Sequence, residues 1–166
     1  MPSVTFKTEK RPSALQVEFN NIPGPFRNGS RCVLWRYELR DEKWTKVPYQ
    51  TNGRRASSTD PQTWGSFKSV RRAYRTGGWD GVGFVLSEDD DLVGVDLDHC
   101  RDPQTGVVEA WAQEIIDTLD SYTELSPSRT GVHVFVRAAF HSPKNREGRI
   151  EIYSTGRYLT VTGHAL

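Results

Sequence analysis

Two acidic side chains, Asp96 and Asp98, stand two positions apart in the segment Gly94-Val95-Asp96-Leu97-Asp98. Strict alternation of polar and apolar residues is typical of a β-strand with one buried face. Because side chains two apart in a strand share a face, Asp96 and Asp98 should lie side by side, about 7 Å apart at ~3.3 Å per residue. Neighbouring carboxylates repel one another, and a divalent cation with a preference for oxygen ligands, Mg²⁺ or Mn²⁺, relieves that repulsion. The pattern therefore predicts a metal site; the alternative is an exposed acidic turn that continues from Asp89-Asp90-Asp91.

Two later segments repeat the same alternation. His133 interrupts the valines of residues 132–136, and Glu151 stands between Ile150 and Ile152. In each segment the apolar residues should face the core, which turns the polar side chain to the opposite face. We expect Asp96, Asp98, His133 and Glu151 to converge on one open sheet face, although a strand histidine is more often structural than functional.

The loop that precedes His133 carries groups able to bind a phosphate. Ser126 and Ser128 offer hydroxyls, Arg129 offers a guanidinium, and Gly131 permits close approach of the backbone to a ligand. Serine, proline and glycine are equally ordinary turn residues, so a plain turn is the alternative.

A second arginine follows the segment with Glu151. Arg157 comes directly after Gly156 in a short polar stretch between two apolar runs. Its guanidinium could pair with a triphosphate or with Glu151, and the alternative is a tight turn between two strands.

The charge distribution limits how nucleic acid could be bound. The formal net charge is only +1, so binding would need a local basic patch rather than a global field. One short stretch contains such a group, with a solvated helix face as the alternative: Arg54, Arg55, Lys68, Arg71, Arg72 and Arg75.

Several other classes of protein are disfavoured. Two widely separated cysteines, Cys32 and Cys100, indicate neither a disulfide framework nor a structural zinc site, despite His99 beside Cys100. No signal peptide and no long apolar run is present, so we expect a cytoplasmic protein without a membrane partner.

The elements that must position these residues can be read from hydrophobic periodicity. Two helices are expected: one that Asp60 caps, with Pro61 in its first turn and an apolar face of Trp64, Phe67, Val70 and Tyr74, and one at 107–119. Strands are expected at 32–37, 82–86, 92–98, 132–136, 150–153 and 158–162; Pro48 argues against a central strand at 43–49. Short polar turns between strands suggest hairpins, above all between 82–86 and 92–98.

This order of elements predicts an α+β fold. We expect one mostly antiparallel sheet with a layer of helices over one face and the other face open. Residues 1–29 are polar and rich in proline and glycine, so they are interpreted as a loose arm ahead of a catalytic domain at 30–166.

The motifs together resemble a known family. In chain order the sequence contains Asp96-Leu97-Asp98-His99, then Ser121-Tyr122-Thr123-Glu124-Leu125-Ser126-Pro127-Ser128-x-x-Gly131-x-His133, then Glu151-x-Tyr153-x-x-Gly156-Arg157-Tyr158-x-Thr160-x-Thr162-Gly163. Upstream it contains Lys46-Val47-Pro48-Tyr49, Asn52-Gly53, Ala56-Ser57-Ser58-Thr59-Asp60-Pro61 and Trp64. From about Val33 to Gly163 the chain is similar to the primase-polymerase domains of phages and plasmids and to CRISPR-associated ones, in the archaeo-eukaryotic primase superfamily.

The resemblance implies an open-faced sheet related to the RNA-recognition-motif palm, and it implies roles for the candidate residues. Asp96, Asp98 and Glu151 would be the catalytic metal ligands, and His133 would contact the phosphates of the incoming nucleotide. The remaining nucleotide-binding candidates are Ser126, Ser128, Arg129, Arg157 and Lys46. The one departure is Arg129, where the family usually has glycine, and it puts the backbone shape of that loop in question.

The activity implied is template-directed transfer of nucleotides from nucleoside triphosphates, with Mg²⁺ or Mn²⁺ as cofactor and a DNA template and primer as partners. One ion would lower the pKa of the attacking 3′-hydroxyl and the other would neutralise the triphosphate. Relatives often continue into a helicase, so a helicase domain or protein is a further expected partner. The alternatives are a non-catalytic nucleic-acid-binding module on the same fold and a metal-dependent nuclease.

Overall fold

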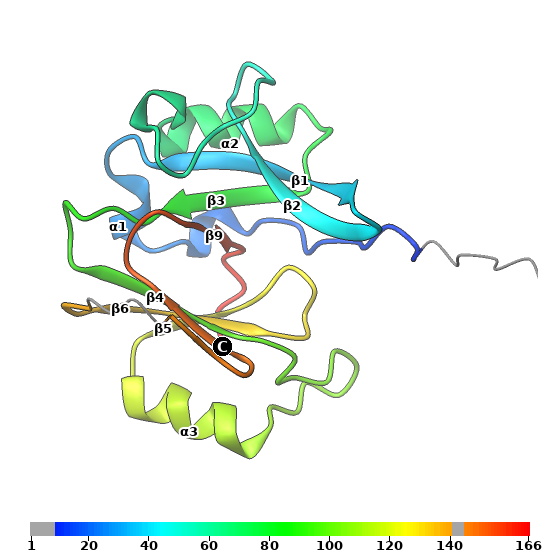
Figure 1. Ribbon diagram of the computed structural model, residues 1–166, viewed down its shortest axis with the longest axis vertical. Coiled ribbons are helices and arrows are strands. Elements are labelled where there is room, and N and C mark those ends of the chain that lie inside the picture. The colour runs from blue at the N-terminus through cyan, green and yellow to red at the C-terminus, as the bar shows by residue number, and fades with distance from the viewer. Residues whose placement is uncertain (1–8, 141–144) are drawn as a thin grey trace, which may run out of the picture.

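Antiparallel strand pairs form most of the regular structure. The computed structural model describes residues 9–140 and 145–166 (Figure 1). One sheet has the order β2-β1-β3-β9 and contains β1 (Cys32–Arg40), β2 (Lys43–Tyr49), β3 (Gly81–Val85) and β9 (Tyr158–Val161). The other has the order β5-β6-β4-β8-β7 and contains β4 (Leu92–Leu97), β5 (Tyr122–Leu125), β6 (Val132–Arg137), β7 (Arg146–Glu147) and β8 (Ile150–Tyr153). The expected α+β class and antiparallel pairing are confirmed, with two sheets in place of the one expected.

The two sheets lie between two helices. Figure 1 shows α2 (Phe67–Arg75) above the four-stranded sheet and α3 (Ala110–Leu119) below the five-stranded sheet. One buried cluster packs where the sheets face each other and under α2, and a second packs between the five-stranded sheet and α3. Pro48 lies in β2, at the edge of its sheet, where a missing N–H is tolerated.

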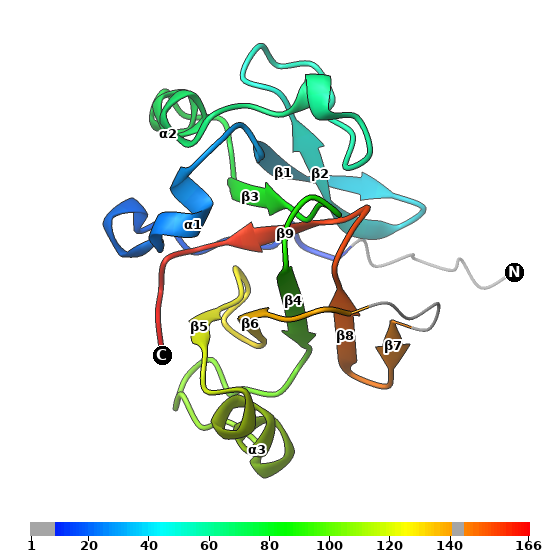
Figure 2. The same cartoon turned by 90° about the vertical axis from the view of Figure 1, so that its left-hand side faces the viewer.

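The expected hairpin between residues 82–86 and 92–98 is wrong. Figure 2 shows β3 and β4 in different sheets, and β8 and β9 are separated in the same way. The connection after β3 begins and ends at buried residues, since Leu86 and Leu92 both belong to the core between the sheets. The chain therefore crosses from one sheet to the other in a segment whose sequence is typical of a turn.

The first expected helix begins later than its cap suggests. Asp60 accepts a hydrogen bond from the N–H of Gln62, at 3.1 Å, but it caps only the short 3₁₀ turn η2 (Pro61–Thr63). Gly65 then pairs through its backbone with Cys32, which holds this stretch extended. The helix α2 starts after Ser66, whose hydroxyl accepts from the N–H of Ser69, at 3.1 Å. The second expected helix, α3, begins at Ala110 rather than at residue 107.

The segment before residue 30 is not a loose arm where the structure describes it. It contains the 3₁₀ turn η1 (Phe19–Asn21) and the short helix α1 (Gly24–Arg27). Phe19, Ile22 and Phe26 are buried. The ring of Phe26 contacts those of Phe84 and Phe135, at centroid distances of 4.9 and 4.8 Å, because it fills the space between the sheets. Residues 1–8 lie outside the described part of the chain.

No helix within the described residues combines the length and the apolar character needed to cross a membrane.

Candidate active site between the two sheets

A row of polar residues crosses the five-stranded sheet. Asp96 on β4 lies opposite His133 on β6 and opposite Glu151 on β8. The row extends to Glu124 on β5, opposite His133, and to Arg146 on β7, opposite Glu151. Directly opposed residues of antiparallel strands project to the same face. The structure thus brings together Asp96, His133 and Glu151, which the alternation placed on one face.

The opposite face of these strands is apolar. Val95, Leu97, Val132 and Val134 are buried with residues of α3 in one cluster. These are the positions that alternation assigned to the core.

The four-stranded sheet lies over part of this polar face, while the Asp96 and Glu151 side chains stay partly exposed. The two sheets pack tightly at Gly94, where a Cβ atom would come within 2.0 Å of Leu159 Cδ1. A residue without a side chain at this position lets β9 approach β4. The polar row therefore lies in a cleft between the two sheets.

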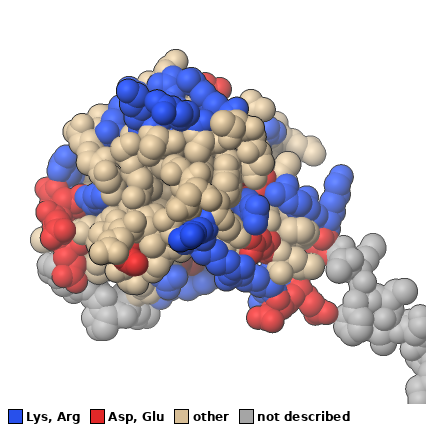
Figure 3. Space-filling view, turned by 90° about the horizontal axis from the view of Figure 1, so that it is seen from above, with Lys and Arg blue, Asp and Glu red and all other residues tan. Residues whose placement is uncertain are grey.

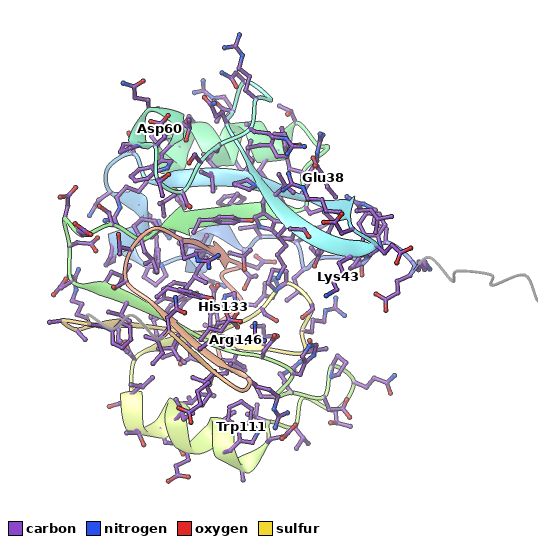
Figure 4. The ribbon with its side chains drawn as sticks, in the orientation of Figure 1. Glu38, Lys43, Asp60, Trp111, His133 and Arg146 are labelled. Atoms are coloured by element: carbon purple, nitrogen blue, oxygen red, sulfur yellow. The ribbon has the colours of Figure 1, made fainter. Side chains whose placement is uncertain are left out.

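The cleft widens into a cavity of about 220 Å³ beside the row. Figure 4 shows His133 between the two sheets, with Arg146 nearby on the side of the five-stranded sheet. Lys46 of β2 and Arg157 are among the residues that line the cavity. The lining residues are Lys46, Asp96, His133, Glu151, Tyr153, Arg157, Tyr158, Leu159 and Thr160.

His133 bridges the two sides of the cleft. Its Nδ1 lies 3.0 Å from the carbonyl oxygen of Thr160 on β9, and its Nε2 lies 3.5 Å from Asp96 Oδ1. A carbonyl oxygen only accepts hydrogen bonds, so Nδ1 is assigned as the protonated donor. The His133 side chain is 4% exposed. Its Nε2 edge is therefore held at the cavity wall next to a carboxylate.

The carboxylate of Glu151 is oriented by two neighbours. Arg146 Nη1 lies 3.0 Å from Glu151 Oε1, and the Tyr153 hydroxyl donates to Oε2. The Arg157 guanidinium lies over the Tyr153 ring, 5.1 Å from its centroid. The Asp96 and Glu151 side chains are 26% and 17% exposed, so both remain accessible to a small ligand.

Asp98 lies just beyond the strand that was expected to carry it. β4 ends at Leu97, although the Asp98 N–H still donates to the carbonyl of Arg149, at 2.8 Å. Its side chain is 43% exposed and does not line the cavity. Within residues 9–140 and 145–166, no three His, Cys, Asp or Glu side chains are grouped so as to hold a metal ion. Asp96 and Glu151 nevertheless fit Mg²⁺ or Mn²⁺ by donor type, since both present carboxylate oxygens to the same cavity.

The serine loop lies outside the cavity lining. Ser126 Oγ accepts from the Gly131 N–H, at 3.1 Å, and Ser128 Oγ lies 3.1 Å from Ser126 Oγ, so the hydroxyls close the loop on itself. Arg129 has φ +67°, the left-handed conformation that glycine adopts without strain. The backbone thus keeps the shape of a glycine loop although the residue is arginine. The loop lies at the end of β4, since a Cβ atom at Gly131 would be 2.9 Å from the carbonyl oxygen of Leu97.

The basic stretch does not line the cavity either. Lys68, Arg71, Arg72 and Arg75 belong to α2, and Figure 3, seen from the α2 side, shows Lys and Arg gathered over that helix. None of these four forms an ion pair with another described residue. Arg54 and Arg55 follow β2, and Arg55 Nη2 lies 3.1 Å from Glu38 Oε2.

Two residues near the site were given no role by sequence reasoning. Glu124 is fully buried at the end of the polar row, and the Thr160 hydroxyl is buried without a hydrogen-bond partner among the described residues. In the sequence, Glu124 could have been noticed as a charged residue within a short strand, between Thr123 and Leu125. The groups that it contacts belong to residues 162 and 163, so its place in the strand could not reveal them.

One comparison with known proteins is informative. Over 141 residues, 81% of its length, the chain is 41% identical to a protein of Nitratiruptor phage NrS-1 named DNA primase-polymerase. The chain spans 19% of the length of that protein. No protein-family model matches the chain. The similarity agrees with the ordered motifs around Asp96, His133 and Glu151, so most of the chain is similar to one part of a phage DNA primase-polymerase.

Proposed function

We propose that this chain is a primase-polymerase catalytic domain that adds nucleotides from nucleoside triphosphates to a strand paired with a DNA template. The observation that carries the proposal is the row in which Asp96 lies between His133 and Glu151, facing a cavity with Lys46 and Arg157. Carboxylates beside cationic groups suit a reaction in which a polyphosphate reacts at a metal centre. The similarity to the phage DNA primase-polymerase supports the same activity.

Asp96 and Glu151 would hold the divalent ion, Mg²⁺ or Mn²⁺, and Asp98 would be the third carboxylate at the end of β4. When bound, the ion would favour ionisation of the attacking 3′-hydroxyl and neutralise charge on the triphosphate. Arg146 and Tyr153 keep the Glu151 carboxylate directed at the cavity, which limits the rearrangement needed on binding.

The cationic groups would hold the nucleotide. Lys46 and Arg157 face the cavity from other elements than His133, so phosphate oxygens there would meet cationic donors beside the Nε2 edge of His133. Ser126, Ser128 and Arg129 would contribute further phosphate contacts from the rim, since their loop adjoins the end of β4.

The DNA would meet the chain outside the cavity. The basic face of α2 offers cations suited to backbone phosphates, whatever the base sequence. A helicase domain or protein is the further partner we expect, and the cytoplasm is the expected compartment.

A labelled primer annealed to a longer template tests the proposal. The chain is incubated with Mg²⁺ or Mn²⁺ and with deoxynucleoside or ribonucleoside triphosphates in separate reactions. A longer primer supports the polymerase, a shorter one indicates a nuclease, and a mobility shift without either indicates a binding module.

Asp96→Asn should abolish extension while DNA binding and the unfolding temperature stay unchanged. Asp117→Asn is the matched control, because Asp117 is an exposed carboxylate on α3 outside the cavity. Extension by Asp96→Asn in Mn²⁺ at the wild-type rate would overturn the proposal.

A further inference from the structure

A fully buried carboxylate lies at the end of the polar row. Glu124 is 0% exposed, and three donors surround it. Its Oε1 accepts from the N–H of Thr162, and its Oε2 accepts from the N–H of Gly163 and from the Tyr122 hydroxyl, each at 2.8 Å. Burying a carboxylate costs several kcal/mol unless hydrogen bonds replace its water, so this set of donors is needed for the group to be tolerated.

The two amide donors belong to a segment that joins the sheets. Residues 158–161 pair with β3 in the four-stranded sheet, whereas the residues that follow bond to β5. Leu125 N–H donates to the His164 carbonyl, at 2.9 Å, and Thr162 Oγ1 donates to the Leu125 carbonyl, at 2.7 Å. The turn itself has little space, since a Cβ atom at Gly163 would lie 2.2 Å from the carbonyl oxygen of Glu18. Glu124 thus bonds the chain at the point where it passes from one sheet to the other.

His133 depends on the same segment. Its Nδ1 is bonded to the carbonyl of Thr160, which lies two residues before Thr162. Glu124 Oε1 is itself 4.0 Å from His133 Nδ1. The ring is therefore held through Thr160 and by the nearby charge, and both constraints fix the side from which Nε2 reaches the cavity.

We propose that Glu124 is the positioning residue of this site: it bonds the 162–163 backbone to β5 and so directs the His133 imidazole at the incoming nucleotide. Glu124 does not line the cavity, so its effect passes through His133 and Thr160. The part that concerns the nucleotide rests on the proposed polymerase function, whereas the orientation of the ring does not.

The electrostatics agree with this geometry. Burial raises the pKa of the Glu124 carboxyl, while His133, the Thr162 N–H, the Tyr122 hydroxyl and the Gly163 N–H favour the charged form. If this position only had to fill space, an apolar residue would do so without the free-energy cost of removing a carboxylate from water.

Glu124→Gln tests the proposal because it keeps the size of the side chain but removes one acceptor oxygen. An amide nitrogen must then face a backbone N–H, so the 162–163 segment and the ring should shift. A displacement of about 1 Å at a reacting centre can lower a rate by about a hundredfold. We therefore expect kcat for primer extension to fall about tenfold to a hundredfold, with the KM for the primer-template unchanged.

Thr123→Val is the matched control. Thr123 is buried in the same strand but lies opposite Val134, on the α3 side, and its hydroxyl donates to the Ser121 carbonyl. A purely structural loss should lower the unfolding temperature in both variants and leave both with wild-type kinetics below it. That result for Glu124→Gln would overturn the proposal.

Nuclear magnetic resonance of the His133 ring supplies a readout that does not need activity. In the wild-type chain we expect the Nδ1 proton to be hydrogen-bonded and slow to exchange, and in Glu124→Gln to be shifted and faster to exchange. If Glu124→Gln does not fold, the measurement on the wild-type chain still tests the proposal. An unprotonated Nδ1, or an Nδ1 proton that exchanges freely with water, would contradict it. A chain with the expected ring signals but no extension activity would overturn the proposed function and leave the positioning intact.

Discussion

The two faces of the five-stranded sheet differ in almost every respect although the same strands form them. Towards α3 the strands present Val95, Leu97, Val132 and Val134, which pack into an apolar cluster. Towards the other sheet they present the row from Glu124 to Arg146, in which every member carries a charge or an imidazole. Within the row, each polar side chain is thus one residue away from an apolar side chain that packs against α3, because the pleat sends successive side chains to opposite faces.

The separation is sharpest at the neighbours Asp96 and Leu97. Asp96→Ala should abolish nucleotide incorporation with little change in unfolding free energy, since the side chain is partly exposed and its backbone pairing is unaffected. Leu97→Ala should lower the unfolding free energy by about 2–5 kcal/mol, because the residue is fully buried, and should keep near-normal kcat below the unfolding temperature. Extension assays and urea unfolding of both variants measure this. Equal loss of stability in the two would contradict the division of roles.

A smaller effect on catalysis is expected when Lys46, on the four-stranded sheet, is changed. Lys46 reaches the cavity from β2, in the four-stranded sheet, and a charge-assisted hydrogen bond contributes about 1.5–3 kcal/mol. Lys46→Gln should raise the KM for the nucleoside triphosphate about tenfold while kcat changes less. Lys43→Gln, an exposed change in the same strand outside the cavity lining, is the control. An unchanged nucleotide KM in Lys46→Gln would show that Lys46 does not contact the nucleotide.

The smallest effect concerns the loop that joins β5 to β6. Arg129 holds a left-handed φ, which costs a residue with a side chain about 1–2 kcal/mol. Arg129→Gly should therefore raise the unfolding free energy by about 1 kcal/mol, less the greater flexibility of glycine in the unfolded chain. Thermal unfolding measures the gain, and a loss of stability would show that the guanidinium contributes more than the strain costs.

Local alternation was enough to predict which side chains share a face. The positions of Asp96, His133 and Glu151 relative to their valine and isoleucine neighbours follow from the period of a strand, which depends on nothing distant. The ordered motifs likewise carry the resemblance to phage primase-polymerases, because residue types and their spacing are properties of the sequence alone.

Other features required the tertiary structure. The segment after β3 reads as a hairpin turn, yet Leu86 and Leu92 are buried between the sheets and the chain crosses over. Proline and glycine suggested a loose arm before residue 30, yet Phe19, Ile22 and Phe26 find aromatic and aliphatic partners from later strands. Local pattern cannot decide these cases, because the energy comes from contacts with residues far along the chain.

Glu124 shows the limit most clearly. The sequence by itself determined that an acid stands in a short strand before the serine loop, and that Asp96 and Glu151 belong to the polar faces of their strands. Only the tertiary structure decided that Glu124 meets the amides of residues 162 and 163, and that a second sheet covers part of the polar row. The physical reason is that the direction of a side chain is set by its own backbone, whereas its partners are set by how the strands pair and pack.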